Sequence, residues 1–272
     1  MDAKVHRWVQ RHGWDRAVEH YQRHWREQLR PAHDAVFEMA ALAPGERVID
    51  IACGTGMVTL PAARAVGRGG SVLATDLSQK MVDDTARRAD EWGLANVTAS
   101  RCDAEQLGAV GGFDVAVCAL GLMYVPAPDA ALAEMARVLR PGGRAVAAVW
   151  GERRKCGWAE IFPIVDSRVA SDVCPLFFGL GGPGVLAEAF RRAGFGHVHE
   201  RRIDAELLYD DDSAALGAAF LGGPVALAHS RFDPDTRTAA YADYLASIEP
   251  FRHGRGYRVP GEFVIVSGHT DT

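Results

Sequence analysis

The first half of the chain alternates between two spacings of its hydrophobic residues. Short apolar runs bounded by glycine, proline or charged residues are typical of buried parallel strands, and stretches with an apolar residue at every third or fourth position are typical of helices. Strands joined by single helices predict right-handed crossovers and an α/β fold with a doubly wound, mostly parallel sheet. The predicted strands are 47–52, 71–75, 96–101, 113–120 and 144–150, and the predicted helices are 58–66, 78–93 and 129–140.

Particular residues indicate where these helices begin and end. Ser78 stands directly before a helix-spaced apolar set and is a favoured N-cap residue. Pro61 is compatible with a helix only in its first turn, so that helix should begin near Val58. The sequence Pro141-Gly142-Gly143 should stop the helix before the fifth strand.

After the fifth strand the alternation becomes less regular. Residues 151–184 contain several aromatic side chains among glycines and prolines, and residues 213–256 suggest helices and loops. A helix is predicted at 185–192, and strands at 197–208 and 263–267. The expected sheet is therefore seven-stranded.

Composition narrows the classes of partner. Of the 272 residues, 48% are hydrophobic and 24% charged, so a sizeable core is expected. The 30 basic and 35 acidic residues are interspersed and give a net charge of −5, which argues against binding nucleic acid or anionic lipid. The chain opens without the apolar segment of a secretion signal and has no apolar run long enough to span a bilayer. We therefore expect a cytoplasmic protein without membrane insertion.

Cysteine and metal-ligand patterns predict neither a disulfide framework nor a metal. The five cysteines are odd in number and form no CxxC pair. The chain also lacks an HExxH sequence and a cluster of carboxylates that would suit a cation. Cys53, which follows the first strand, is interpreted as a packed small side chain and not as a nucleophile.

The most informative motif is Asp50-Ile51-Ala52-Cys53-Gly54-Thr55-Gly56, at the end of the first predicted strand. Glycines at this point permit a sharp turn and let the backbone approach a ligand closely. A glycine loop alone is weak evidence, because several nucleotide-binding folds share it. Asp50 would repel a pyrophosphate but suits a cationic amino acid and sulfonium, and the loop continues to Val58-Thr59 instead of to a third glycine. Both details favour S-adenosylmethionine over a dinucleotide.

Ordered motifs along the chain resemble those of class I S-adenosylmethionine-dependent methyltransferases, especially the ubiquinone/menaquinone C-methyltransferase-like (UbiE-like) group. Residues 50–56 are similar to the D-x-G-C-G-T-G of that group, with Ala52 in place of the usual glycine. The D-L-S-x-x-M of 76–81, the D-A-E of 103–105 and the R-V-L-R-P-G-G of 137–143 follow where that family has similar motifs. The resemblance covers residues 44–150 and implies a Rossmann-like fold.

The resemblance also implies roles for the matching residues. Asp76 would accept hydrogen bonds from both ribose hydroxyls of the cofactor, which an ionised acceptor strengthens. Asp103 would accept one from the adenine amino group, and Asp50 with the loop backbone would hold the methionine part. The residues implied in cofactor binding are Asp50, Ala52, Cys53, Gly54, Gly56, Asp76, Leu77, Met81, Asp103 and Ala104.

The sequence thus predicts methyl transfer from S-adenosylmethionine to a small organic acceptor by direct in-line displacement. Since the sulfonium already activates the methyl group, the protein mainly has to hold the acceptor atom close and aligned, and no catalytic residue is identified. Residues 119–122 lack the Asn/Asp-Pro-Pro-Tyr of amino-methylating nucleic-acid enzymes. An NAD(P)-dependent oxidoreductase and a non-catalytic S-adenosylmethionine-binding protein are the alternatives. Neither the acceptor, nor the element methylated, nor the oligomeric state follows from the sequence.

Segments outside the predicted sheet are left to cover the acceptor. Residues 5–29 are amphipathic and rich in aromatic side chains, and Pro31 suits the first turn of a second helix. We expect residues 1–43 to form an N-terminal helical lid. Residues 44–272 should form the methyltransferase domain, with insertions near 151–184 and 213–256 as a helical cap on the acceptor site.

Three lid residues are candidates for contact with the acceptor. Tyr21 and Trp25 are neighbours on one helical face, and Trp14 lies about two turns before Tyr21. Each of them taken singly is more simply explained by packing against the core. Taken together they favour a lid that encloses an apolar acceptor and excludes water.

Overall fold

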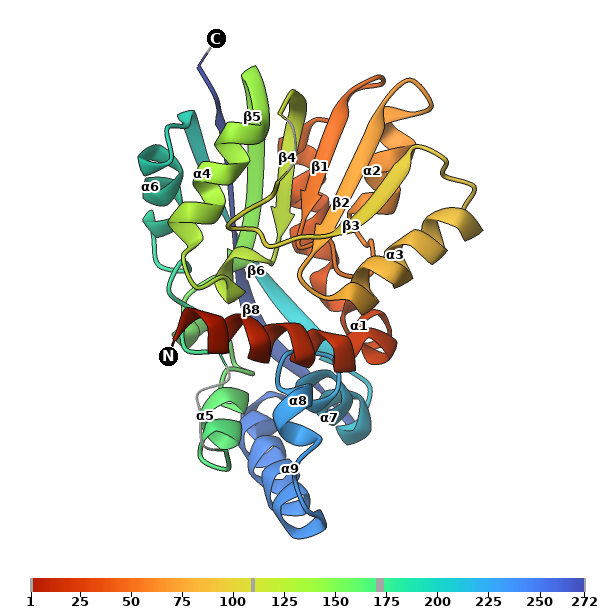
Figure 1. Ribbon diagram of the computed structural model, residues 1–272. Coiled ribbons are helices and arrows are strands. Elements are labelled where there is room, and N and C mark those ends of the chain that lie inside the picture. Colours follow the sequence, from red (N-terminus) through yellow and green to blue (C-terminus); the bar gives the residue numbers. More distant parts are fainter. Residues whose placement is uncertain (1, 109–110, 170–173, 272) are drawn as a thin grey trace.

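The computed structural model describes residues 2–108, 111–169 and 174–271. Its sheet has eight strands in the order β3-β2-β1-β4-β5-β8-β6, with β7 paired to β8 (Figure 1). Strands β1 to β5 pair in parallel, and β8 runs antiparallel to both β5 and β6. The strands are β1 (Arg47–Ile51), β2 (Ser71–Asp76), β3 (Val97–Arg101), β4 (Phe113–Ala119), β5 (Leu139–Trp150), β6 (Gly196–Tyr209), β7 (Arg252–His253) and β8 (Gly256–His269).

The predicted doubly wound, mostly parallel sheet is confirmed, but the predicted number of seven strands is wrong. The eighth strand, β7, has only two residues and forms a hairpin with the start of β8. A two-residue strand leaves no alternating pattern, so its segment suggested helices and loops. Strand β5 also begins earlier than predicted, because Leu139 pairs with Phe113 across an irregularity that precedes Arg144.

Helices cover the sheet, and a further group of helices lies beyond the carboxyl ends of its parallel strands. In Figure 1, α4 and α6 lie in front of the sheet, while α5, α7, α8 and α9 form a separate group below the carboxyl ends of the parallel strands. The α-helices are α1 (Ala3–Ala40), α2 (Thr59–Val66), α3 (Gln79–Glu91), α4 (Pro128–Val138), α5 (Ile161–Asp166), α6 (Val185–Arg192), α7 (Asp212–Phe220), α8 (Ala226–His229) and α9 (Pro234–Ile248). The 3₁₀ helices are η1 (Leu122–Tyr124), η2 (Arg153–Lys155) and η3 (Glu249–Phe251). None of the described helices is long and apolar enough to cross a membrane.

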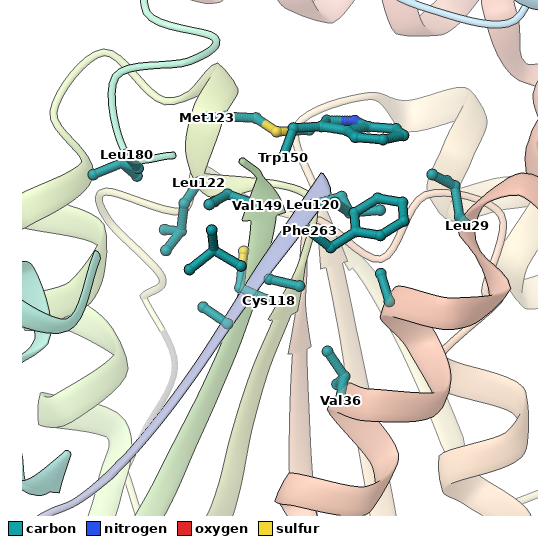
Figure 2. Close-up of a cluster of buried hydrophobic side chains, with 14 of the residues drawn as sticks. Leu29, Val36, Cys118, Leu120, Leu122, Met123, Val149, Trp150, Leu180 and Phe263 are labelled. Carbon is teal, nitrogen blue, oxygen red and sulfur yellow. The ribbon is translucent and has the colours of Figure 1, made fainter. Parts of the chain in front are cut away.

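Helix α1 corrects the prediction of two N-terminal helices, because it continues through Pro31. A proline inside a helix removes one backbone hydrogen bond and is a common cause of bending. Here Leu29 and Ala32 are buried on either side of it, so packing against the core favours a continuous helix. The first part of α1 crosses below the carboxyl ends of the strands (Figure 1), and the part from Leu29 to Val36 lies alongside the sheet (Figure 2).

Local signals correctly located two other helices. The Ser78 hydroxyl accepts a hydrogen bond from the backbone N–H of Met81, as expected of the N-cap of α3. Helix α2 begins at Thr59, which leaves Pro61 in its first turn. Both helices therefore start directly after the loops that follow β1 and β2, and these loops form the site.

A buried carboxylate anchors the segment that follows β5. Glu262, on β8, accepts hydrogen bonds from Lys155 (2.5 Å), from Arg202 on β6 (2.6 Å) and from the backbone N–H of Glu152 (3.1 Å). Burial alone would raise the pKa of Glu262, but these donors lower it to about 2. The chain between β5 and α5 is thus fixed to the sheet, next to the aromatic residues described below.

Candidate active site

The loop after β1 has the backbone shape that its glycines suggest. Gly54 and Gly56 adopt positive φ angles of 56° and 81°, which glycine tolerates best. Ala52, where the family usually has glycine, also has a positive φ of 57°, a conformation that costs roughly 1–2 kcal/mol for an L-residue. Gly121 leaves room for the Ala52 methyl group, because a Cβ at position 121 would lie 2.5 Å from it.

Asp76 at the end of β2 is held by this loop and by the start of α3. Its Oδ2 accepts a hydrogen bond from the backbone N–H of Gly54 (3.0 Å), and its Oδ1 accepts one from that of Ser78 (2.8 Å). Burial raises the pKa of Asp76 to about 6. Each carboxylate oxygen has two acceptor sites, so Asp76 retains acceptor capacity for a ligand.

Asp76 faces a pocket at the carboxyl ends of β1 to β4, the strand-end pocket, with about 740 Å³ of space not filled by protein atoms. Part of this space is open to solvent. Nine of the predicted site residues line it: Trp14, Tyr21, Ala52, Gly54, Asp76, Leu77, Met81, Asp103 and Ala104. Gly56 is not part of its lining, and a Cβ at that position would meet Thr85 and Leu60. Gly56 therefore serves the turn and the packing of the loop.

Asp50 and Cys53 line a smaller space of about 260 Å³ on the other side of the glycine loop, the small cavity. Tyr21, Ala52, Gly54 and Ala119 line both this cavity and the strand-end pocket, so the two lie next to each other. Burial raises the pKa of Asp50 to about 7, and the Thr59 hydroxyl donates a hydrogen bond to its Oδ2 (2.6 Å). Burial also raises the pKa of Cys53, which agrees with its interpretation as a packed side chain.

The same small cavity contains His33, which sequence reasoning did not single out as a site residue. Its imidazole is buried and forms no hydrogen bond or ion pair with any residue that the structure describes. Burial lowers the pKa of His33 to about 4, so the ring is neutral and offers one N–H donor and one acceptor. Its ring nitrogens therefore keep hydrogen-bonding capacity toward the small cavity.

Helix α1 is fixed over the strand-end pocket by polar contacts. Arg7 forms an ion pair with Asp103 (2.7 Å) and contacts Glu105. About two turns further along α1, the Asp15 carboxylate accepts a hydrogen bond from the Ser78 hydroxyl (2.6 Å). Asp103, predicted to accept from adenine, is therefore already paired with α1. Among the described residues, no His, Cys, Asp or Glu side chains gather as a metal-binding group.

A second pocket, the aromatic pocket, also takes part of its lining from α1 and has about 580 Å³ of space not filled by protein atoms. Trp25 lines only this pocket, whereas Trp14 and Tyr21 line both. Its other walls come from the loop after β4, from the end of β5, from Trp158, Ile161, Phe162 and Phe177, and from residues between 218 and 225 together with Tyr244. Figure 2 shows two of its residues, Trp150 and Met123, at the same end of the buried cluster. The structure thus brings together the three predicted lid residues and both predicted insertions.

The two pockets share a wall. Trp14, Tyr21, Leu120 and Tyr124 line both of them, and Trp14 contacts the rings of Tyr21 and Tyr124 edge-on at 5.3 and 5.2 Å between centroids. Sequence reasoning missed Tyr124, Leu120 and Arg7, because these residues carry no motif and reach the site only through the fold.

Comparisons with known proteins agree with this geometry. A family model described as a methyltransferase domain matches residues 48–143. Nocamycin O-methyltransferase of Saccharothrix syringae is 31% identical over 237 residues, which cover 82% of this chain and 84% of that protein. A ubiquinone/menaquinone biosynthesis C-methyltransferase of Ralstonia pickettii is 37% identical over 141 residues, covering 49% of this chain and 58% of that protein. The predicted resemblance to the second group is confirmed.

The fold has a counterpart among solved structures. Phosphoethanolamine N-methyltransferase 2 of Haemonchus contortus, in complex with S-adenosyl-L-methionine, superposes with a TM-score of 0.63 at 15% identity, covering 95% of this chain and 57% of that one. At that identity the likeness concerns the fold alone. Taken with the relative that matches over most of both chains, the ordered motifs and the site at the strand ends lead to one assignment. The chain belongs to the class I S-adenosylmethionine-dependent methyltransferases.

Proposed function

We propose that this protein methylates a hydroxyl oxygen of a small organic acceptor, with S-adenosylmethionine in the strand-end pocket and the acceptor in the aromatic pocket. The observation that carries this proposal is the wall that the two pockets share. Methyl transfer requires the two reacting atoms to be within about 3–3.5 Å and aligned. Two pockets that share Trp14, Tyr21, Leu120 and Tyr124 in their linings would bring the two ligands close together. The choice of oxygen is supported by the relative nocamycin O-methyltransferase, whose name gives oxygen as the methylated atom.

The residues of the strand-end pocket and the small cavity fit the cofactor. Asp76 has free acceptor capacity for the ribose hydroxyls, and Leu77 and Met81 offer apolar surface beside it. The small cavity suits the amino-acid end, because Asp50 would pair with the ammonium and the unpaired N–H of His33 would donate to the carboxylate. Asp103 would contact adenine while paired with Arg7.

The chain's own contribution to the reaction is binding, orientation and exclusion of water. S-adenosylmethionine, when bound, would supply the methyl group to the acceptor oxygen and keep the electron pair of the broken bond on its sulfur, and the hydroxyl proton would pass to the bulk solvent outside the site. Burial raises the pKa of both Tyr21 and Tyr124, so both phenols stay protonated. They are therefore hydrogen-bond donors at the shared wall, which stabilise negative charge that develops on the acceptor oxygen.

Helix α1 acts as the lid in this proposal. It supplies Trp14 and Tyr21 to the shared wall and Trp25 to the acceptor side. Its contacts with Asp103 and Ser78 join it to the loops after β3 and β2. Cofactor and acceptor would thus be covered by one element, as closing segments do in other enzymes.

The proposal is tested by incubating the protein with S-adenosylmethionine labelled in the methyl group and a bacterial metabolite extract. We expect label in one or a few small products that carry a new methoxy group. Label on carbon or nitrogen would contradict the choice of oxygen. Binding without any labelled product would favour the non-catalytic alternative, and binding of NAD(P) in place of the cofactor would favour the oxidoreductase.

A further inference from the structure

The aromatic pocket has an unusual lining for a metabolite site. Among its described lining residues there is no Asp, Glu, Lys, Arg or His. Its polar side-chain groups are the hydroxyls of Tyr21, Tyr124 and Tyr244 and the indole N–H groups of its tryptophans. All of these are neutral, because burial raises the pKa of each of the three tyrosines. A charged acceptor would leave water here without gaining an opposite charge, which is costly.

The rings around this pocket form a continuous wall. Starting at the shared wall, Trp14 contacts Tyr124 (5.2 Å between centroids), and Tyr124 contacts Phe177 (5.4 Å). Phe177 then contacts Trp158 (5.5 Å), which contacts Trp150 (4.7 Å). These four contacts are edge-to-face, an arrangement favoured by the ring quadrupoles. Rings packed in this way form a largely preformed apolar site, as small-molecule pockets usually are.

The hydroxyls at the shared wall are placed to orient an oxygen atom. Tyr21 and Tyr124 donate no hydrogen bond from their hydroxyls to any residue that the structure describes. The hydroxyl of Tyr244, on α9, is likewise without a partner among the described residues. A ligand with oxygen substituents at its edges would satisfy these donors, whereas a plain hydrocarbon would leave them unpaired.

We infer that the acceptor is an uncharged aromatic or fused-ring molecule with oxygen substituents, and that its reacting hydroxyl lies at the wall between Tyr21 and Tyr124. This inference rests on the proposed function and specifies its acceptor class. Phosphorylated and carboxylated acceptors are excluded, because the described lining offers these anions no opposite charge.

Gly222 determines how much room the acceptor has. A Cβ at position 222 would lie 2.7 Å from Nε1 and 2.8 Å from Cδ1 of Trp25. Gly222 has no positive φ angle, so alanine is compatible with its backbone. The closest contacts that oppose the methyl group are those with Trp25, and the backbone oxygen of Ala218 lies further away at 3.3 Å. Gly222→Ala would therefore displace the Trp25 indole within the aromatic pocket, while the residues of the strand-end pocket stay in place.

The test uses three naphthalenes that share one ring system: 2-naphthol, 6-hydroxy-2-naphthoate and 6-hydroxynaphthalene-2-sulfonate. Each is titrated by calorimetry into the full-length protein, alone and saturated with S-adenosylhomocysteine, at pH 7. We expect 2-naphthol to bind at least about tenfold more tightly than either anion, given the cost of burying an unpaired charge. With S-adenosylmethionine, we expect 2-methoxynaphthalene as the product.

Gly222→Ala should weaken 2-naphthol binding by about fivefold or more, as overpacking of a filled site does, and leave S-adenosylhomocysteine affinity unchanged. Gly69→Ala is the control, because its methyl group would meet only Gly45 Cα at 3.8 Å. Equal or tighter binding of an anion, no binding of 2-naphthol, or no effect of Gly222→Ala in a folded variant would overturn the inference. Failure of the cofactor product to bind would overturn the proposed function instead, and the naphthalene titrations of the protein alone would still decide the acceptor class.

Discussion

The strand-end pocket and the aromatic pocket lie on either side of one wall, but the chain builds them in different ways. The first is formed mostly by loops that directly follow β1 to β4, and it contains the carboxylates of Asp76 and Asp103. The second draws its lining from α1, from the end of β5 and from segments as distant as residue 244. Cofactor binding is therefore encoded locally at the strand ends, whereas acceptor binding depends on segments added around the sheet.

The largest effect is expected from replacing Asp76, the proposed acceptor for the ribose hydroxyls. This substitution should weaken binding in the strand-end pocket and leave binding in the aromatic pocket unchanged. Asp76→Ala should lose two charge-assisted hydrogen bonds of about 1.5–3 kcal/mol each at most, which corresponds to roughly 10²–10⁴-fold weaker binding of S-adenosylmethionine and S-adenosylhomocysteine. Binding of 2-naphthol to the protein alone should not change. Calorimetry decides this, with the exposed Asp83→Ala on α3 as the control. Unchanged cofactor affinity in Asp76→Ala would remove the basis for the cofactor site.

The second largest effect is expected from removing the part of α1 that lines the aromatic pocket, and it should appear in the rate of methyl transfer. Deleting residues 1–29 should leave a folded protein that binds S-adenosylhomocysteine with modestly reduced affinity, because the loops after the strands remain. Methyl transfer should fall by about 100-fold or more, since the deletion removes Trp14, Tyr21 and Trp25 and opens the site to water. Circular dichroism, calorimetry and labelled-methyl transfer measure the three properties. Full turnover, or loss of folding, would show that α1 is not a lid.

A smaller effect on cofactor affinity is expected from replacing His33, which lines the small cavity. His33→Ala should weaken S-adenosylhomocysteine by about tenfold, because the cofactor carboxylate loses a hydrogen-bond donor. The same variant should bind 5′-methylthioadenosine, which lacks the amino-acid end, as well as the unchanged protein does. Equal loss for both ligands would mean that His33 supports the loop and does not contact the amino-acid end.

The smallest effect is a dependence of cofactor binding on pH. In the protein without ligand the pKa of Asp50 is raised to about 7 and that of Asp76 to about 6. Carboxyl groups with raised pKa values favour the folded state at low pH, and that contribution is lost as the pH rises through about 4 to 7. A cationic ligand pairs with the ionised carboxylates, so its affinity increases as the pH rises through these pKa values.

Affinity for S-adenosylmethionine should therefore increase a few-fold between about pH 6 and 8, with net release of protons on binding. Calorimetry in buffers of different ionisation enthalpy measures this release. Asp50→Asn, which keeps an oxygen for the Thr59 hydroxyl, should reduce it. Proton uptake on binding in the unchanged protein would contradict the assignment of these two carboxylates.

The contrast between the pockets also explains what the sequence could predict. The order of strands and helices up to Trp150, and the positions of Asp76 and Gly54, follow from local patterns. Their chemistry depends on backbone turns and strand ends that a few neighbouring residues determine. The two-residue strand β7 could not be predicted in this way, because its pairing with β8 leaves no pattern of its own.

The missed features depend on contacts between distant parts of the chain. Helix α1 continues through Pro31 because residues on both sides of it are buried against the sheet, which a local rule for proline does not include. His33 and Gly222 have no motif around them. His33 is identified only by its burial without a partner beside Asp50, and Gly222 only by its approach to Trp25.

The most direct test is a crystal structure of the protein with S-adenosylhomocysteine and 2-naphthol together. We expect both ligands to be bound at once, with the nucleoside beside Asp76 and Leu77 and the naphthalene in the aromatic pocket. The naphthol oxygen should lie at the wall formed by Tyr21 and Tyr124, facing the sulfur of the cofactor product. A naphthol bound in the strand-end pocket in place of the nucleoside, or bound only on the surface, would contradict the account.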